Sequence, residues 1–107
     1  DLCEQVRAMG QTPIVIDSAD IRVNPEGALK ALCAAIGLEW DAAMLSWPAG
    51  PKPFDGIWAA HWYDAVHRST GFARAESELP VLSGELQVIN EKALPIYERL
   101  AALKLSV

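Results

Sequence analysis

A short apolar run without an evident partner constrains the fold of this chain more than any other feature. Residues 13–16 read Pro-Ile-Val-Ile, a continuous apolar stretch that ends at Asp17. Continuous rather than alternating apolarity is typical of a strand covered on both faces, as in a parallel sheet. Such a strand needs neighbours on both edges, because its backbone N–H and C=O groups must be paired once buried. The chain holds no second run of this quality. We therefore expect one buried, parallel-type strand at about residues 13–17, belonging to a larger α/β domain.

The composition is that of one small, acidic and rather apolar domain. Hydrophobic residues make up 51% of the 107 residues, as expected if one face lies against other polypeptide. The net charge of −5, with no basic cluster, argues against a nucleic-acid surface. No apolar stretch approaches the ~20 residues of a membrane span and no signal peptide is evident, so we expect a cytoplasmic protein with no membrane partner. Cys3 and Cys33 lie in apolar stripes, which favours buried thiols over a disulfide.

Helical spacing dominates the rest of the chain and predicts four or five helices. The clearest start is Asn24 as N-cap, followed by Pro25 and Glu26, and Gly37 ends that helix. We expect the last helix to begin at the cap Ser83 and to contain Pro95, which removes one hydrogen bond of the helix. The other expected helices cover about 2–9, 41–47 and 58–70. The first of them is already in helical register at the first residues, without a Met, so we expect the chain to begin inside a longer protein and to be a single partial domain over residues 1–107.

A proline-rich loop at 47–56 interrupts the helices. Three prolines and a glycine within residues 47–53 exclude regular structure there. A loop of this kind can close over a substrate, which makes Trp47, Trp58 and His61 candidates for a substrate pocket. Packing in a core is the competing interpretation of the tryptophans, and we favour it for Trp62.

Several strings along the chain form a recognisable pattern. They are Asn-Pro-Glu at 24–26 with a helix closed by Ile-Gly at 36–37, Leu-Ser-Trp-Pro-Ala-Gly-Pro at 45–51, Trp-Ala-Ala-His-Trp-Tyr at 58–63, His-Arg-Ser-Thr-Gly-Phe at 67–72 and Leu-Pro-Ile-Tyr-Glu-Arg-Leu at 94–100. The pattern resembles the C-terminal half of the sulfotransferase family of P-loop proteins, in particular a bacterial branch. The resemblance covers nearly the whole chain and implies a mostly helical α/β fragment. The turn at 17–21 keeps only the final Asp and the aliphatic residue of the family pattern.

The resemblance also implies a cofactor. Family members transfer a sulfuryl group from 3′-phosphoadenosine-5′-phosphosulfate (PAPS) to a hydroxyl or an amine. The string at 67–72 matches a family loop that touches the 3′-phosphate and adenine, so the resemblance assigns this role to Arg68, Ser69, Thr70 and Gly71. The family's common Arg-Lys-Gly triplet is absent, which leaves Arg68 as the one charge. The competing interpretation is a helix C-terminus, with Arg68 near the last carbonyls and Gly71 as the cap.

No catalytic residue is expected within these 107 residues. The chain has no Gly-rich loop with Lys-Ser/Thr to hold a phosphosulfate, and nothing matches the family's general base. His61, Asp64 and His67 have the spacing of a surface hydrogen-bonding group rather than of a metal site.

Three functions stay open. The chain is the C-terminal portion of a sulfotransferase-like protein, completed by a missing N-terminal half; or it is a helical interaction module; or it is a paralogue that keeps the fold without activity. The module would pair its lone strand with a partner chain or with its own copy, as a homo-oligomer.

Overall fold

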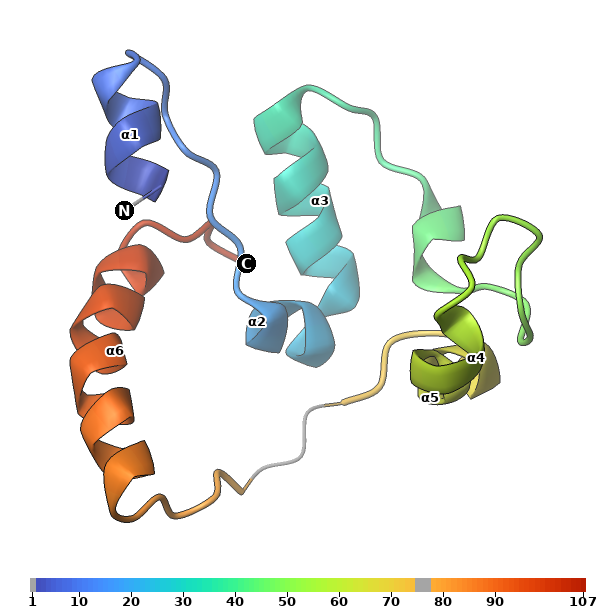
Figure 1. The fold of residues 1–107 in the computed structure, drawn as a ribbon. Helices are drawn as coiled ribbons and strands as arrows, with labels where there is room; N and C mark the ends of the chain where they lie inside the picture. The colour runs from blue at the N-terminus through green and yellow to red at the C-terminus, as the bar shows by residue number, and fades with distance from the viewer. Residues whose placement is uncertain (1, 75–77) are drawn as a thin grey trace.

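The computed structural model describes residues 2–74 and 78–107, which form six α-helices and one 3-10 helix joined by irregular segments (Figure 1). The mostly helical character is confirmed, although the six α-helices exceed the four or five expected. The elements are α1 (Leu2–Ala8), α2 (Ser18–Val23), α3 (Pro25–Ile36), the 3-10 helix η1 (Ala42–Leu45), α4 (Ala59–Trp62), α5 (Asp64–Arg68) and α6 (Glu85–Ala101).

Local capping signals place α3 and η1 as the sequence predicts. The Asn24 side chain accepts a hydrogen bond from the Gly27 amide at 3.1 Å, and Pro25 occupies the first turn of α3. Gly37 ends α3 in the left-handed conformation with a φ of 74°. Asp41 caps η1 by accepting from the Ala43 amide at 2.8 Å. Each bond joins residues two or three positions apart, so it forms independently of distant parts of the chain.

Three predicted helix boundaries are wrong. The acidic turn after residue 16 begins a helix, because the Asp17 side chain accepts from the Ala19 amide at 2.9 Å and caps α2. The helix expected over 58–70 is divided at Tyr63 into α4 and α5. The last helix begins after Gly84 and not at a Ser83 cap, and no side chain caps it.

The buried strand expected at 13–17 is not confirmed. Among the described residues this segment has one pairing, a parallel bridge between Val15 and Lys104 in which the Leu105 amide donates to the Val15 carbonyl at 2.9 Å. Figure 1 shows the segment after α1 running beside the C-terminal residues. Ile14 is exposed and the rest of the run is half-buried. A buried parallel strand needs covering layers on both faces, and the described residues do not supply them.

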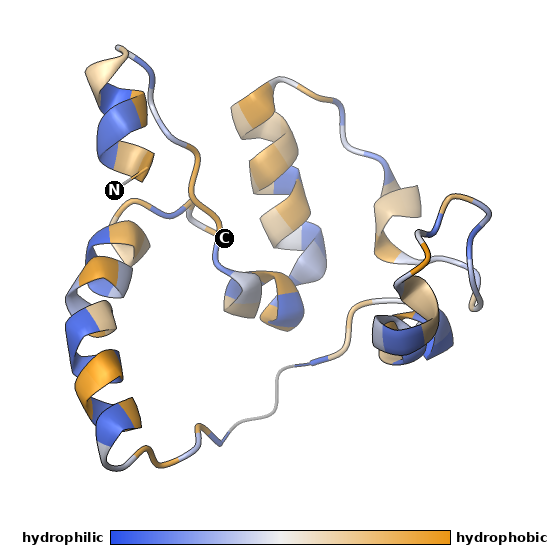
Figure 2. Ribbon diagram, in the orientation of Figure 1, coloured by the Kyte–Doolittle hydropathy of each residue, from blue (hydrophilic) through white to orange (hydrophobic). Residues whose placement is uncertain are grey.

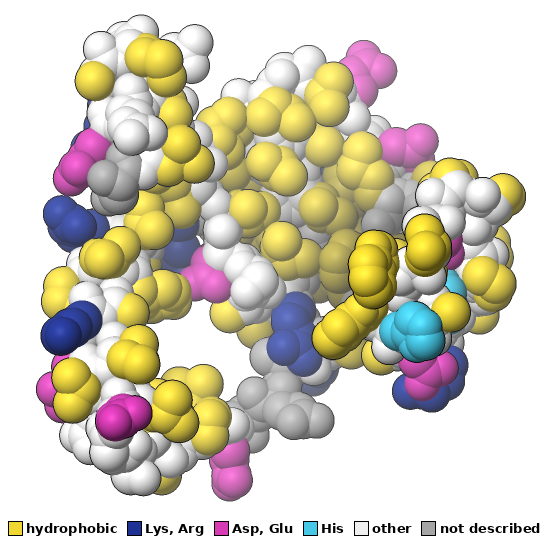
Figure 3. Space-filling model, viewed as in Figure 1, with side chains coloured by type: hydrophobic (Ala, Val, Ile, Leu, Met, Phe, Trp, Pro, Cys, Tyr) yellow, Lys and Arg dark blue, Asp and Glu magenta, His cyan; other side chains and the backbone are white. Residues whose placement is uncertain are grey.

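The described residues enclose very little core. The buried hydrophobic residues among them are Ala28, Cys33 and Ala59. The chain exposes 8732 Å², whereas a folded monomer of 11.6 kDa exposes about 5,800 Å². Its radius of gyration is 17.1 Å, against about 13 Å for a compact domain of this length. Hydrophobic residues recur along α1, α3 and α6 (Figure 2), and hydrophobic side chains cover much of the face shown in Figure 3.

The structure also describes the two cysteines and the length and apolarity of the helices. Cys3 and Cys33 are both free thiols, and Cys33 is buried beside Met44, while Cys3 is only half-buried. No helix within residues 2–74 and 78–107 is long and apolar enough to cross a membrane.

Candidate functional site

The candidate cofactor segment and the proline-rich loop lie against each other. The Trp47 amide donates to the Thr70 carbonyl at 3.0 Å, and the Gly50 amide donates to the His67 carbonyl at 2.6 Å. Ser46 and Gly71 form an isolated antiparallel bridge next to the contact of Trp47 with Thr70. We call this contact of residues 46–55 with residues 67–72 the loop junction. Segments that are about twenty residues apart in sequence thus share one local structure.

The Trp47 side chain makes two contacts within the loop junction. Its indole N–H donates to the Ser69 hydroxyl at 3.0 Å, and that hydroxyl donates to the Val66 carbonyl at 2.7 Å. The indole ring meets the Phe72 ring edge to face, with centroids 5.2 Å apart. The Ser69 hydroxyl therefore already donates and accepts within the chain, which gives it a structural partner on each side.

Asp55 and His67 form a partly buried hydrogen bond within the loop junction. Asp55 Oδ2 lies 2.9 Å from His67 Nε2 and also accepts from the Lys52 amide at 2.8 Å. The side chains are 18% exposed for Asp55 and 21% exposed for His67. The Lys52 amide and then the His67 ring hold the pKa of the Asp55 carboxyl below its usual range. The carboxylate is thus stabilised in its charged form by two donors.

Arg68 and Thr70 keep side-chain donors at the surface of the loop junction. Arg68 pairs with Asp64 one turn earlier in α5, and both side chains are well exposed. Asp64 therefore does not bond to a histidine, and the expected hydrogen bonding of His67 goes to Asp55 instead. Thr70 is exposed, and its backbone carbonyl accepts from Trp47. An exposed ion pair is worth little, so the Arg68 guanidinium can exchange Asp64 for a stronger anion.

Gly71 lets the backbone at residue 71 lie close to the Leu45 carbonyl, and it does not cap a helix. A Cβ at this position would lie 3.2 Å from the Leu45 carbonyl oxygen. Gly71 has no positive φ, and α5 ends at Ser69 in an extended conformation. The interpretation of Gly71 as the left-handed cap of a helix is therefore wrong.

The predicted pocket residues Trp47, Trp58 and His61 do not come together in one pocket. Trp47 lines a shallow pocket of about 340 Å³ together with Arg22, Val66 and Phe72. Trp58 and His61 lie instead on the exposed surface around α4, where Trp58 is 68% exposed. Trp62 is 74% exposed, so its expected place in the core is wrong for the described structure. No group of three or more metal-ligating side chains occurs in the part of the chain that the structure describes.

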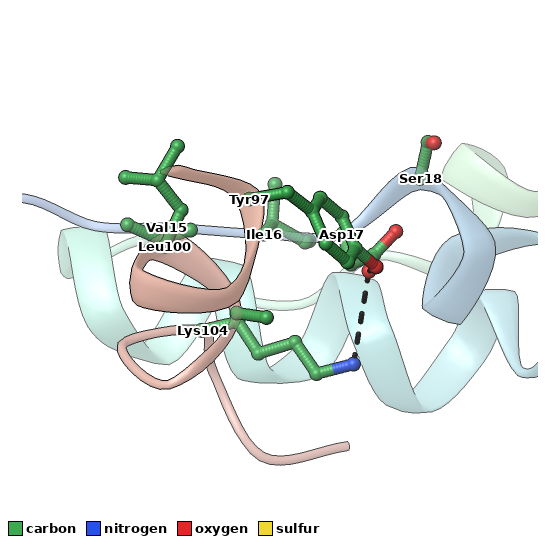
Figure 4. A pocket seen from close by; sticks show the side chains of 8 residues that line it. Val15, Ile16, Asp17, Ser18, Tyr97, Leu100 and Lys104 are labelled. Atoms are coloured by element: carbon green, nitrogen blue, oxygen red, sulfur yellow. Dashed lines mark hydrogen bonds and ion pairs between the residues drawn. The ribbon is translucent and has the colours of Figure 1, made fainter. Parts of the chain in front are cut away.

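A second polar cluster, which the sequence did not suggest, joins α6 to the start of α2. Tyr97 donates its hydroxyl hydrogen to Asp17 Oδ2 at 2.8 Å, and Lys104 Nζ lies 2.7 Å from Asp20 and 3.8 Å from Asp17. Asp17, Tyr97 and Lys104, with the apolar side chains beside them, line a pocket of about 300 Å³ (Figure 4). The partners are at least 80 positions apart. No spacing rule connects residues so far apart, so the sequence carries no local signal for this cluster.

The polar bonds of this cluster shift the pKa values of its members in opposite directions. The Ala19 amide and then the Tyr97 hydroxyl hold the pKa of Asp17 below its usual range. The hydrogen bond to Asp17 raises the pKa of Tyr97, and the Asp20 carboxylate raises that of Lys104. Each group is held in the protonation state that it has at neutral pH.

Arg22 is a further residue that the sequence analysis did not single out. Its side chain donates to the carbonyls of Ala73 at 3.3 Å and Arg74 at 3.0 Å. It thereby ties α2 to the chain immediately after the loop junction.

Comparison with known proteins identifies the family. The sulfotransferase domain family matches residues 6–104, which is most of the chain, and the chain belongs to this family. The chain is 38% identical over 100 residues to the branched-chain-amino-acid aminotransferase-like protein 2 of Arabidopsis thaliana. It is 39% identical over 97 residues to the aminotransferase-like protein 1 of the same plant. Each alignment covers 91% of this chain but only 17% of the relative's length. No solved structure matches the chain significantly.

Proposed function

We propose that this chain is the C-terminal portion of a sulfotransferase-like domain that transfers a sulfuryl group from PAPS to a hydroxyl or amine acceptor. The observation that carries the proposal is the family match, which extends over residues 6–104 without relying on any single motif. The phosphate loop and the general base would lie in an N-terminal half outside these residues. In this proposal the 107 residues contribute part of the cofactor site and one wall of the acceptor pocket, and are not catalytic alone.

The exposed surface supports a partial domain. The excess over the area expected of a folded monomer is roughly 2,900 Å², and a standard interface between two proteins buries about 1,600 Å² in total. The parallel bridge at Val15 is of the kind found in α/β sheets and leaves room for further strands. A missing half that supplies those strands would cover the exposed apolar side chains.

The loop junction fits the 3′-phosphate of the cofactor in part. Arg68 and Thr70 offer exposed donors, and a guanidinium is well suited to a phosphate. Ser69 offers less, because its hydroxyl is engaged with Trp47 and Val66. When bound, PAPS would supply the sulfuryl group, and the role of these residues is to hold the nucleotide. We propose Arg68 and Thr70 as its direct contacts, with Ser69 and Gly71 maintaining the shape of the segment.

The two plant relatives are named aminotransferase-like proteins, but this chain matches only 17% of the length of each. Their name is therefore no basis for proposing an aminotransferase activity for this chain. The matched segment is the part that belongs to the sulfotransferase domain family.

Nucleotide binding by the full-length protein tests the proposal. Adenosine 3′,5′-bisphosphate should raise the midpoint of thermal unfolding, and Arg68→Ala should weaken binding about 10- to 100-fold, as expected for the loss of a charge-assisted bond. Arg7→Ala is the matched control, because it removes the same charge from α1, far along the chain. A full-length protein whose unfolding does not respond to the nucleotide would contradict the proposal.

The interaction module stays as a second candidate because, among the residues that the structure describes, Val15 is paired on one side, with the C-terminal residues. It predicts that the 107-residue chain associates as its concentration rises, and that Val15→Pro abolishes association. A chain that stays monomeric at high concentration excludes this candidate.

A further inference from the structure

We infer that Asp55 and His67 act as a latch that fastens the proline-rich loop to residues 67–71 and so positions Arg68 and Thr70. The inference that the latch affects nucleotide binding rests on the proposed function. The latch itself is a property of the loop junction and can be tested without any nucleotide.

The burial of side chains in the loop around Asp55 is the reverse of the usual pattern. Phe54 and Ile57 are 85% and 84% exposed, whereas the carboxylate of Asp55 between them is turned inward and is 18% exposed. Large apolar side chains usually fix the conformation of a segment by being buried, and carboxylates are usually exposed. Phe54 and Ile57 contribute little burial, in contrast to Trp47, which packs on Phe72 at the other end of the loop. The conformation of the part of the loop around Asp55 therefore depends on its polar bonds.

The bonds between the loop and residues 67–71 lie on both sides of Arg68 in the sequence. The His67 end of the segment is tied by the Asp55 carboxylate at 2.9 Å and by the Gly50 amide at 2.6 Å. The other end is tied by the Trp47 amide to Thr70 and by the Ser46–Gly71 bridge. Arg68 lies between the two ties. A shift of the loop would break the bonds to His67, which precedes Arg68 in the last turn of α5.

The bond between Asp55 and His67 is preoriented and partly shielded from solvent. Asp55 is held from its own loop by the Lys52 amide at 2.8 Å, so its carboxylate is already aimed at His67. The Tyr63 ring stands edge-on to the imidazole, with ring centroids 6.0 Å apart. A half-buried, preoriented pair loses less conformational entropy on bonding than an exposed one.

Amide hydrogen exchange in the full-length protein tests the latch. Asp55→Asn and His67→Gln should each speed exchange in residues 46–55 about tenfold or more, while exchange in α3 stays the same. Asp64→Asn is the matched control, because it removes a neighbouring carboxylate whose ion pair is exposed and outside the latch. The double variant should exchange no faster than either single variant, since both changes break the same bond. Unchanged exchange in both variants, or effects that simply add, would overturn the latch.

Nitrogen NMR of the unmodified full-length protein gives an independent measurement should a variant fail to fold. The Nε2 signal of His67 should show a hydrogen bond to a carboxylate, and the exposed ring of His61 is the reference within the same chain. Identical signals from the two histidines would overturn the latch.

The nucleotide measurement separates this inference from the proposed function. Asp55→Asn should weaken binding of adenosine 3′,5′-bisphosphate although Arg68 is intact. Faster exchange with unchanged affinity would overturn the positioning role. If the unmodified protein binds no nucleotide, the proposed function and the positioning role fail, while the exchange result still decides the latch.

Discussion

At the scale of single residues, Asp17 and Asp55 follow the same rule. Each accepts one hydrogen bond from a backbone amide within three residues and a second from a ring side chain farther along the chain. The first bond is a local turn or cap that an aspartate forms readily. The second bond joins two elements of the fold. These two aspartates therefore convert local turns into tertiary contacts, from Asp17 to α6 and from Asp55 to α5.

Acid should weaken the Asp17 contact in a defined direction. The pKa of Asp17 is held below its usual range in the folded protein, so its stabilisation is fully present above about pH 4 and is lost as pH falls through the lower folded value. Tyr97→Phe removes one of the two donors and should bring the pKa of Asp17 closer to the usual range. Urea unfolding of the full-length protein should show the variant less stable at pH 7, with the difference shrinking toward pH 3 and below. A difference that is constant across this range would contradict the role of Asp17.

At the scale of elements, the start of α6 depends on the backbone conformation of Gly84 and not on a side-chain cap. The helix begins after Gly84, whose φ of 59° and ψ of −134° suit glycine and few other residues. No side chain caps the helix. The chain therefore turns into α6 through the conformational freedom of a glycine, and the adjacent serine is not needed for the turn.

Substitutions at residues 83 and 84 separate these two explanations. Gly84→Ala should lower the free energy of unfolding of the full-length protein by about 1–3 kcal/mol, because alanine is strained in this conformation. Ser83→Ala should change it by less than about 0.5 kcal/mol, as for an ordinary surface position. Chemical denaturation measures both values. The reverse order, with the serine variant less stable, would restore Ser83 as the cap.

At the scale of the whole molecule, the apolar surface around α4 is the clearest sign of missing contacts. Trp58 and Trp62 are both more than two-thirds exposed, and Phe54 and Ile57 are exposed beside them in sequence. A single exposed tryptophan needs no explanation, but four exposed large apolar side chains within residues 54–62 are typical of a contact surface. In the proposed domain this surface lies against the N-terminal half.

Truncation of Trp62 tests whether the full-length protein covers this surface. Trp62→Ala should lower the free energy of unfolding by about 3–5 kcal/mol if the side chain is buried there. A side chain that stays in solvent would give a change within about 0.5 kcal/mol. Glu39→Ala, at an exposed charged position, is the control and should have little effect. A small effect of Trp62→Ala would contradict a covered surface at α4.

The elements that depend on neighbouring residues could be predicted from the sequence. Asn24, Pro25 and Gly37 determine the two ends of α3, and Asp41 determines the start of η1, because each acts within three residues of its partner. The family resemblance was equally accessible, since it rests on strings that are continuous in the chain, and the family match confirms it. The sequence pattern did not predict α2. It predicts the end of a strand at Asp17, whereas Asp17 caps a helix in the structure.

The sequence alone thus determined the capped helices, the loop at the prolines and the family. Only the tertiary structure decided the partners of His67, Ser69 and Tyr97, which lie 12, 22 and 80 positions from them. It also decided that Gly71 serves close approach to Leu45 and that Trp62 is exposed. The physical reason is that a capping bond closes a loop of two or three residues, whereas these contacts exist only once separate elements have been brought together by packing. For the segment at 13–17, strand pairing depends in the same way on chains that lie beside it.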